Sequence, residues 1–211
     1  MNISGFVPLS LCDYPGRVAA AVFTQGCNYR CPWCHNGHLL PSVGDPSGRI
    51  PEQDVLQTLC RRRTMLEGVV ISGGEPTLQA GLPRFVRHIK DMGLAVKLDT
   101  NGSRPEVLRL LLSDGLLDYI AMDIKAPWHK YGALTGLECC DTGAVRESVA
   151  LVAASGLPHQ FRTTRVDALL DESDYVEIRR QIPHSSPHVW QEFRAAYSLD
   201  PALRAEAVAA Q

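Results

Sequence analysis

Residues 17–37 read RVAAAVFTQGCNYRCPWCHNG, a short β-rich run followed by three closely spaced cysteines. Arg17–Thr24 predicts a buried strand, because it is a brief apolar run rich in strand-forming residues. The strand leads directly into a loop with the three thiols of Cys27, Cys31 and Cys34. Pro32 favours a tight loop here over a helical turn. The stretch therefore predicts a strand with a metal-binding or cluster-binding loop at its carboxyl end.

The same alternation of β-rich and helical runs continues along the chain. Five further strands are expected at Gly68–Ser72, Ala95–Asp99, Asp118–Asp123, His159–Val166 and His188–Gln191. Helices are expected at Pro51–Arg63, Gln79–Met92, Pro105–Ser113, about Gly143–Ser155 and Glu172–Gln181. Repeated strand–helix units predict an α/β fold with a parallel sheet covered by helices. Six units are too few for an eight-stranded barrel, so a partial (β/α)6 TIM-like barrel or an open parallel sheet remains.

The unusual short motifs follow the predicted strands. GGEP begins at Gly73, DTNG at Asp99 and MDIK at Met122, and each stands at the end of a different strand. In either architecture, binding sites collect at the carboxyl ends of parallel strands. We therefore expect these motifs and the cysteine loop to surround one site.

Three thiolates so close together repel one another unless a cation or a cluster holds them. Zinc would need a fourth ligand, which His35 or His38 could supply. Against zinc, Cys34 and His35 are adjacent, and the paired C-x-x-C spacing of many zinc sites is absent. Iron–sulfur clusters normally take four cysteines. A four-iron cluster held by three would leave one iron open to a substrate, and this interpretation is favoured over zinc.

Composition excludes several classes of protein. The chain has 211 residues, which suits one domain, 1–211, and a net charge of −2 with scattered Lys and Arg, so we expect no nucleic-acid partner. No apolar run of about 18 residues predicts a membrane helix, and the N-terminus does not resemble a secretory signal. Seven cysteines, an odd number, favour a reducing cytoplasm. The alanine-rich end is expected to form a closing helix or to fray from about residue 196.

The C-x-x-x-C-x-x-C spacing after a strand, with Trp33 before the third cysteine, resembles the radical S-adenosylmethionine (SAM) superfamily. TQGCNYRCPWCHNGHLL is similar to the activating enzymes of glycyl-radical proteins. SLCDYPGRVAAAVF further resembles the activating proteins of anaerobic ribonucleoside-triphosphate reductase, relatives of the pyruvate formate-lyase activator. The resemblance covers about residues 3–192. It implies one [4Fe–4S] cluster on the three cysteines, with SAM as the ligand of the open iron, and no metal contact by His35 or Asn36.

The resemblance also implies which residues surround SAM. The candidate set is Asn36, Ser72, Gly73, Gly74, Glu75, Asp99, Lys125, Arg162, Thr164 and Gln191. Within it, the glycines would let the backbone approach the SAM amino group, while Glu75 would order the loop. Lys125 would pair with the SAM carboxylate. Arg162 and Thr164 alternate on one strand and so share a face; the alternative for Arg162 is an ion pair with a carboxylate of a helix. Gln191 stands near the place of a family histidine.

Asp99 and Asp123 are expected to lie close together at the rim of the sheet, where they repel unless a cation or proton separates them. In the pyruvate formate-lyase activator the matching positions hold a monovalent cation. The resemblance therefore implies a possible Na⁺ or K⁺ site with four contributors, Asp99, Thr100, the carbonyl of Met122 and Asp123. The alternative is that Asp99 caps a helix and Asp123 lies on the surface.

The function implied is hydrogen-atom abstraction from a glycine of a large partner enzyme, with electrons from a flavodoxin-like or ferredoxin-like donor. Two alternatives remain: a radical SAM enzyme acting on a small molecule, such as a deazapurine-forming synthase, and a structural zinc module. Cys60 is expected to lie in a helix, with its side chain in the core of the protein. Cys139 and Cys140 are expected to be incidental, so that the chain holds one cluster.

Overall fold

The computed structural model describes residues 1–41, 48–137 and 141–204. These residues form one seven-stranded sheet in the order β1-β2-β3-β4-β5-β6-β7. The strands are β1 (Ile3–Ser10), β2 (Ala19–Thr24), β3 (Gly68–Gly73), β4 (Ala95–Thr100), β5 (Tyr119–Asp123), β6 (His159–Arg165) and β7 (His188–Glu192). The α-helices are α1 (Glu52–Arg62), α2 (Leu82–Asp91), α3 (Pro105–Ser113), α4 (Tyr131–Thr135), α5 (Thr142–Ala154) and α6 (Glu172–Arg180).

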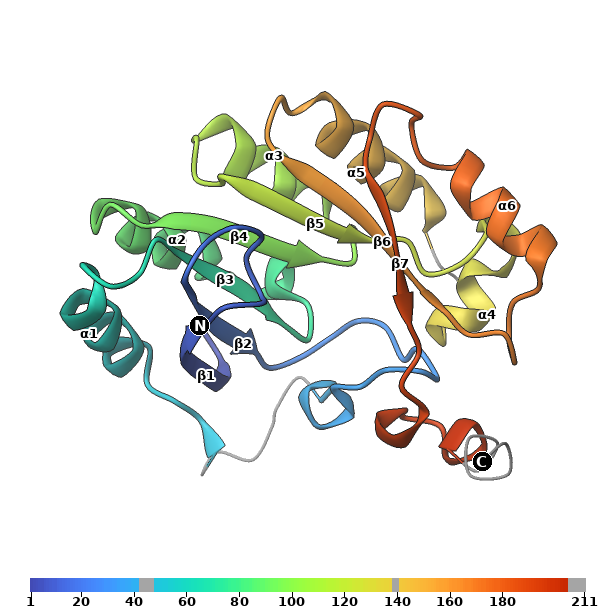
Figure 1. The fold of residues 1–211 in the computed structure, drawn as a ribbon, viewed down its shortest axis with the longest axis horizontal. Helices are drawn as coiled ribbons and strands as arrows, with labels where there is room; N and C mark the ends of the chain where they lie inside the picture. The colour runs from blue at the N-terminus through green and yellow to red at the C-terminus, as the bar shows by residue number, and fades with distance from the viewer. Residues whose placement is uncertain (42–47, 138–140, 205–211) are drawn as a thin grey trace.

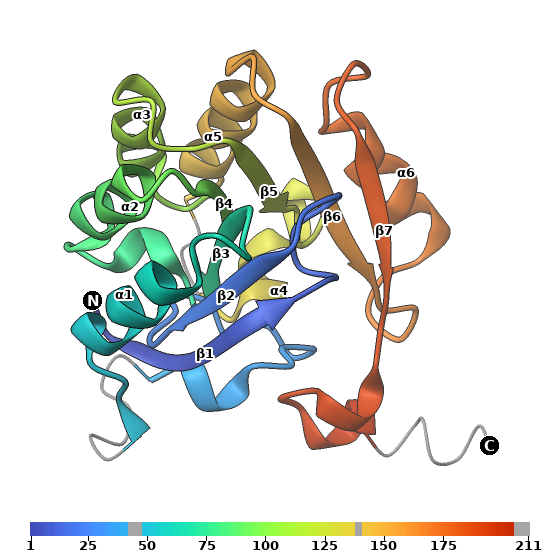
Figure 2. The same ribbon diagram turned by 60° about the vertical axis from the view of Figure 1, so that its left-hand side comes forward.

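Strands β2 to β7 are parallel and follow one another in chain order. Figures 1 and 2 show a curved sheet with α1, α2, α3, α5 and α6 along its outer side. This is the predicted partial (β/α)6 barrel, and the predicted elements agree with the observed ones to within a few residues. All parallel strands end at the same rim, where the predicted motifs lie.

Strand β1 was not predicted. It pairs antiparallel with β2 at the edge of the sheet, with register shifts on both sides of its centre. Its sequence, ISGFVPLS, contains a glycine and a proline, which weaken a strand signal but are tolerated in edge strands. The parallel partial barrel therefore has an additional antiparallel strand at its first edge.

The two faces of the sheet differ in what they bury. The outer face contributes to the large apolar core beneath the helices, and helix α2 shows why the helices pack there. Its four apolar side chains at helical spacing, Leu82, Phe85, Val86 and Ile89, are fully buried. The inner face carries only a small apolar cluster of Tyr14, Ala19, Ala21 and Val70. Polar and charged side chains occupy the rest of the inner face near the rim.

One expectation about the periphery needs correction. Cys60 is exposed on α1, because Val55 and Leu59 form the buried side of that helix. In the C-terminal segment, residues 201–204 are helical and Ser198 and Leu203 are buried, so the described part agrees with a closing helix. Cys139 and Cys140 lie outside the described residues. No described helix is both long and apolar enough to cross a membrane.

Candidate functional site: a pocket at the carboxyl ends of the strands

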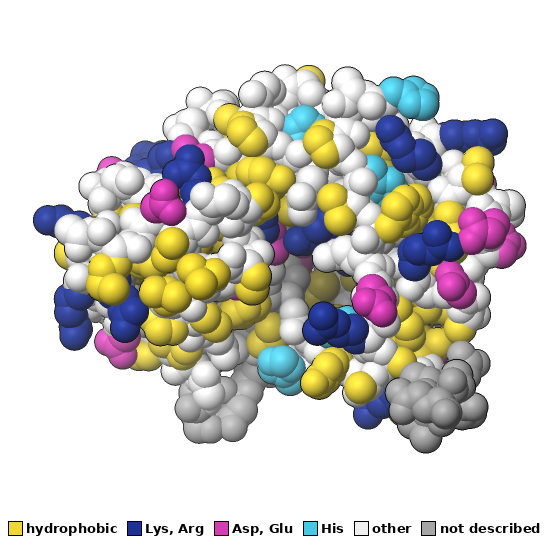
Figure 3. All heavy atoms as spheres, in the orientation of Figure 1, with side chains coloured by type: hydrophobic (Ala, Val, Ile, Leu, Met, Phe, Trp, Pro, Cys, Tyr) yellow, Lys and Arg dark blue, Asp and Glu magenta, His cyan; other side chains and the backbone are white. Residues whose placement is uncertain are grey.

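A pocket of about 270 Å³ opens at the rim where the parallel strands end. It lies beside the cysteine loop, and Figure 3 shows a hollow in the middle of this face of the molecule. Its lining combines residues of the loop after β2, of strands β3 to β7 and of the loops that follow β3, β4 and β5: Cys27, Tyr29, Cys31, Trp33, Cys34, His35, Asn36, Leu40, Ser72, Gly73, Gly74, Glu75, Asp99, Thr100, Asn101, Asp123, Lys125, Arg162, Thr164 and Gln191. Every predicted site residue except Met122 lines this pocket; the side chain of Met122 is buried in the outer core, whereas its prediction concerned the carbonyl oxygen.

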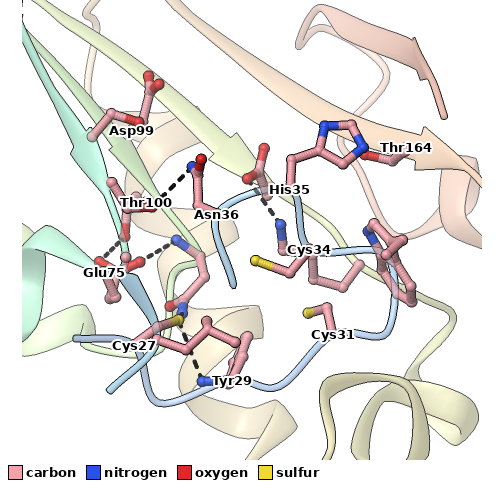
Figure 4. A pocket seen from close by; sticks show the side chains of 18 of the residues that line it. Cys27, Tyr29, Cys31, Cys34, His35, Asn36, Glu75, Asp99, Thr100 and Thr164 are labelled. Atoms are coloured by element: carbon pink, nitrogen blue, oxygen red, sulfur yellow. Dashed lines mark hydrogen bonds and ion pairs between the residues drawn. The ribbon is translucent and has the colours of Figure 1, made fainter. Parts of the chain in front are cut away.

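The cysteine loop is irregular, as Pro32 predicted, and distant parts of the chain support it. The backbone N–H of Arg30 donates to the carbonyl of Thr135 at the end of α4, at 2.7 Å. The N–H of Asp200 donates to the carbonyl of Pro32 at 2.8 Å. Figure 4 shows the three cysteine sulfurs pointing into one space. The loop thus holds its thiols in a fixed arrangement at the mouth of the barrel.

The environment of these thiols favours a cationic occupant. Burial raises the pKa of Cys27, and it raises the pKa of Cys31 to about 12, although Lys125 opposes both shifts. Thiolates at these positions therefore need a nearby positive charge such as iron. Among the described residues, no three His, Cys, Asp or Glu side chains are close enough to hold a single metal ion. Three thiols that face one space are nevertheless a donor set of the kind that holds iron–sulfur clusters.

Glycine is required at positions 73 and 74 because neighbouring backbone atoms leave no room for a side chain. Gly73 has φ +114°, and a Cβ there would lie 2.3 Å from the amide nitrogen of Thr24. A Cβ on Gly74 would lie 2.1 Å from the carbonyl oxygen of Gly26. Their first observable role is therefore to let β3 and its following loop pass close to the end of β2. The sequence analysis expected the close approach to involve a ligand.

Glu75 orders this region, as predicted. Its side chain is buried and accepts hydrogen bonds from the backbone and hydroxyl of Thr77, from the hydroxyl of Thr100 at 2.8 Å and from the N–H of Asn101 at 2.7 Å. Burial raises the pKa of Glu75, although these donors oppose the shift. The GGEP and DTNG motifs are thus joined through one carboxyl group (Figure 4).

The side-chain amide of Asn101 extends this connection to the cysteine loop. It donates to the side-chain oxygen of Asn28 at 2.9 Å and lies 3.9 Å from the sulfur of Cys27. The backbone N–H of Tyr29 also donates to that sulfur, at 3.4 Å. The sequence analysis overlooked Asn101, although its place inside DTNG at a strand end was a usable signal.

Asp99 and Asp123 both lie at the rim, and the guanidinium group of Arg162 contacts both. Its Nε donates to Asp123 at 2.8 Å and its NH1 to Asp99 at 3.4 Å. Lys125 donates to the other oxygen of Asp123 at 2.9 Å. Burial alone would raise the pKa of Asp123, but Arg162 and Lys125 outweigh it and hold that pKa at about 2. The expected repulsion between the carboxylates is therefore relieved by cations of the chain itself, and Arg162 forms a structural ion pair.

The remaining candidates surround the same pocket. Asn36 donates to the carbonyl of Gly73 at 3.5 Å. Thr164 of β6 is paired with Gln191 of β7, so the last two strands present both side chains to the pocket. The ring of His35 packs against Phe193 and Tyr197 of the C-terminal segment. This packing was missed, because nothing in the local sequence links residues so far apart.

Comparison with known proteins supports this geometry. The model of the Radical SAM superfamily matches residues 21–180. A protein of Methanocaldococcus jannaschii that bears the provisional name glycyl-radical enzyme activating enzyme is 31% identical over 204 residues, covering 94% of this chain and 82% of its own. A 7-carboxy-7-deazaguanine synthase of Hyperthermus butylicus is 35% identical over 98 residues, covering 46% of this chain and 40% of its own.

A solved structure shows the same fold at low sequence identity. Streptococcus suis SuiB bound to its precursor peptide SuiA has a TM-score of 0.65 at 11% identity, over 87% of this chain and 43% of that one. The match leaves more than half of that longer chain uncovered. Because the superfamily model matches most of the chain, including the cysteine loop, this protein belongs to the radical SAM superfamily and is a radical SAM enzyme.

Proposed function

We propose that this enzyme activates a glycyl-radical enzyme, and specifically an anaerobic ribonucleoside-triphosphate reductase. The observation that carries the proposal is the single pocket into which three cysteine thiols and the GGEP, DTNG and MDIK motifs converge. The M. jannaschii protein that bears this provisional name supports the class of partner, since the similarity covers 94% of this chain and 82% of that protein. The chain would act as one domain in an anaerobic cytoplasm.

The chain's residues would divide the work of cofactor binding. Cys27, Cys31 and Cys34 would hold one [4Fe–4S] cluster. With SAM bound, a reduced cluster supplies one-electron cleavage of the sulfonium bond and hence hydrogen-atom abstraction. Lys125 carries the cationic group best placed to meet the SAM carboxylate, because its ammonium group lines the pocket beside Asp123. A flavodoxin-like or ferredoxin-like protein would supply the electron.

Binding of the nucleoside and methionine parts would fall to the remaining lining. Asn36, Thr164 and Gln191 offer amide and hydroxyl groups at the mouth. Ser72 precedes Gly73 at the end of β3 and faces the same space. These groups form hydrogen bonds without acid–base chemistry, which is consistent with hydrogen-atom abstraction.

The first experiment asks whether the three thiols hold the cluster. Cys27→Ala, Cys31→Ala and Cys34→Ala should each lose iron, visible absorbance and production of 5′-deoxyadenosine after anaerobic reconstitution. Cys60→Ala is the matched control, because Cys60 is exposed on α1, and it should retain all three. A Cys31→Ala variant that kept its iron and its SAM cleavage would refute the ligand assignment.

The second experiment tests the partner. The reconstituted enzyme, SAM and a reductant are mixed with the large glycyl-radical chain of the anaerobic reductase from the same organism. The proposal expects a glycyl-radical signal in electron paramagnetic resonance and one 5′-deoxyadenosine per radical formed. SAM cleavage without a radical on that reductase or on any other glycyl-radical protein of the organism would contradict it.

A second candidate function is hydrogen abstraction from a small molecule. It is favoured by the 35% identity to a 7-carboxy-7-deazaguanine synthase, which extends over less than half of either chain. With a deuterated small-molecule precursor of a deazapurine and no protein partner, this candidate predicts deuterium in 5′-deoxyadenosine. The activase proposal predicts none.

A further inference from the structure

Lys97 of β4 is a charged residue inside the barrel that the proposed function does not use. Its side chain is 3% exposed, and its ammonium group contacts Asp99 Oδ1 at 2.5 Å. On the neighbouring strands it is flanked by Val70 of β3 and Tyr119 of β5. A lysine in such surroundings is costly unless a carboxylate pairs with it. Asp99 is the carboxylate that the described structure provides.

Lys97 completes a group of alternating charges across three strands. Asp99 Oδ1 contacts Lys97, and Asp99 Oδ2 contacts Arg162. Asp123 Oδ1 contacts Arg162, and Asp123 Oδ2 contacts Lys125. Every carboxylate oxygen of the pair therefore already has a nitrogen partner. Two carboxylates face three cations, so the group carries one surplus positive charge.

These residues fit a bound monovalent cation poorly. A hard cation binds oxygen donors whose negative charge is available to it, and each of the four carboxylate oxygens already faces a cationic group of the chain. The hydroxyl of Thr100 is engaged as well, since it donates to Glu75 and accepts from the N–H of Gly102 at 3.1 Å. An added Na⁺ or K⁺ would also meet a group that is already net positive, which repels it.

We propose that the ammonium group of Lys97 takes the place of a monovalent cation as the counter-charge of Asp99, so that this enzyme binds SAM without Na⁺ or K⁺. The inference rests on the proposed SAM site. Lys97 neutralises Asp99 from inside the barrel, and Arg162 neutralises it from β6. The surplus positive charge, carried at the rim by Lys125, is left for the carboxylate of SAM. Lys97 is thus a positioning residue, because it acts through Asp99.

The test is direct binding of SAM to the reconstituted enzyme by isothermal titration calorimetry. Titrations are compared in potassium chloride and in choline chloride at equal ionic strength, because unequal screening would change exposed charge interactions. The Kd of the wild-type protein is expected to be the same in both salts. A wild-type affinity about tenfold weaker in choline chloride would overturn the inference.

Lys97→Met provides the second arm. It keeps most of the side-chain volume but leaves Asp99 without its inner partner. Its affinity for SAM should fall by about tenfold or more in choline chloride, because a buried charge is left incompletely compensated. Potassium should restore part of this loss by filling the vacated position. Equal affinity in both salts would refute the role assigned to Lys97.

Two matched variants separate this role from a general loss of structure. Lys90→Met removes another lysine–carboxylate pair, with Asp118, outside the pocket lining, and should show no salt effect on SAM binding. The double variant Lys97→Met/Asp99→Asn removes both charges, so its affinity should not depend on potassium. Thermal unfolding confirms that each variant is folded. Failure of every folded protein to bind SAM in either salt would instead refute the proposed function.

Discussion

The two faces of the one sheet are built on opposite principles. On the outer face, apolar side chains pack beneath the helices, as Phe85 of α2 does with none of its surface exposed. On the inner face near the rim, Asp99, Asp123, Lys97 and Arg162 form ion pairs within the barrel. Apolar burial is non-directional and scales with area, whereas ion pairs depend on exact partners. The outer face therefore supplies stability, and the inner face supplies a defined electrostatic site.

The sharpest test of this comparison is Phe85→Ala. Removing a fully buried aromatic side chain should lower the free energy of unfolding by about 3–5 kcal/mol, measured by urea denaturation. The Kd for SAM of the molecules that remain folded should be unchanged, since α2 lies outside the pocket lining. Leu110→Ala, at a position 46% exposed on α3, serves as control and should change stability by less than about 0.5 kcal/mol. A selective loss of SAM binding in Phe85→Ala would break the comparison.

Arg162→Met tests the inner face. Losing a cation shared by two partly buried carboxylates should lower the free energy of unfolding by about 2 kcal/mol, less than for a fully buried pair because Lys97 and Lys125 remain. SAM affinity should fall together with stability. The control is Arg87→Met, which removes an exposed pair with Asp114 and should cost no more than about 1 kcal/mol. An Arg162→Met variant with wild-type SAM affinity would show that the charge group is only structural.

Asp123→Asn tests the ion pairs of the inner face through the pH dependence of stability. The folded state holds the pKa of Asp123 at about 2, below its unfolded value of 3.8. The group therefore stabilises the protein above about pH 4, and this stabilisation, on the order of 2 kcal/mol, is lost as the pH falls toward 2. Chemical denaturation across this range should show a shallower pH dependence for Asp123→Asn than for the wild type. Identical slopes would contradict the ion pairing described for the rim.

The smallest expected effect is that of Thr164→Val. Thr164 lies on the inner face of β6 and lines the pocket. The variant should weaken SAM binding only a few-fold, in keeping with a single hydrogen bond worth about 1 kcal/mol, and leave the unfolding midpoint nearly unchanged. Thr58→Val on the exposed side of α1 is the matched control, with no effect on SAM affinity. A large loss of stability in Thr164→Val would assign this hydroxyl to folding instead of binding.

The outer face could be predicted from sequence because helical spacing reports burial directly. The positions of Leu82, Phe85, Val86 and Ile89 predicted the packing of α2, and the strands followed from their apolar runs. Strand β1 could not be predicted, since its glycine and proline weaken the pattern and its pairing with β2 is a long-range choice. Periodicity thus predicts which side of a helix or strand is buried, but it predicts less reliably where a strand pairs within the sheet.

The inner face was predictable only in part. The motifs indicated that Asp99 and Asp123 would meet at the rim, and both contact Arg162 there. Lys97 was overlooked, although a residue two positions before Asp99 must share its face of the strand. The sharing of Arg162 between two carboxylates depends on the register of β5 against β6, which sequence patterns do not fix. Charge partners across strands therefore required the structure.

The bracing of the cysteine loop has a consequence for the order of biosynthesis. Translation produces Pro32 and Gly37 early, yet Asp200 donates to the carbonyl of Pro32, and Leu199 lies against Gly37. Domains take shape as the chain emerges from its N-terminal end. A nascent chain on the ribosome therefore exposes its three thiols in a loop that still lacks these contacts. The loop can therefore receive iron and sulfide in its fully braced form only after residues 199 and 200 have left the ribosome.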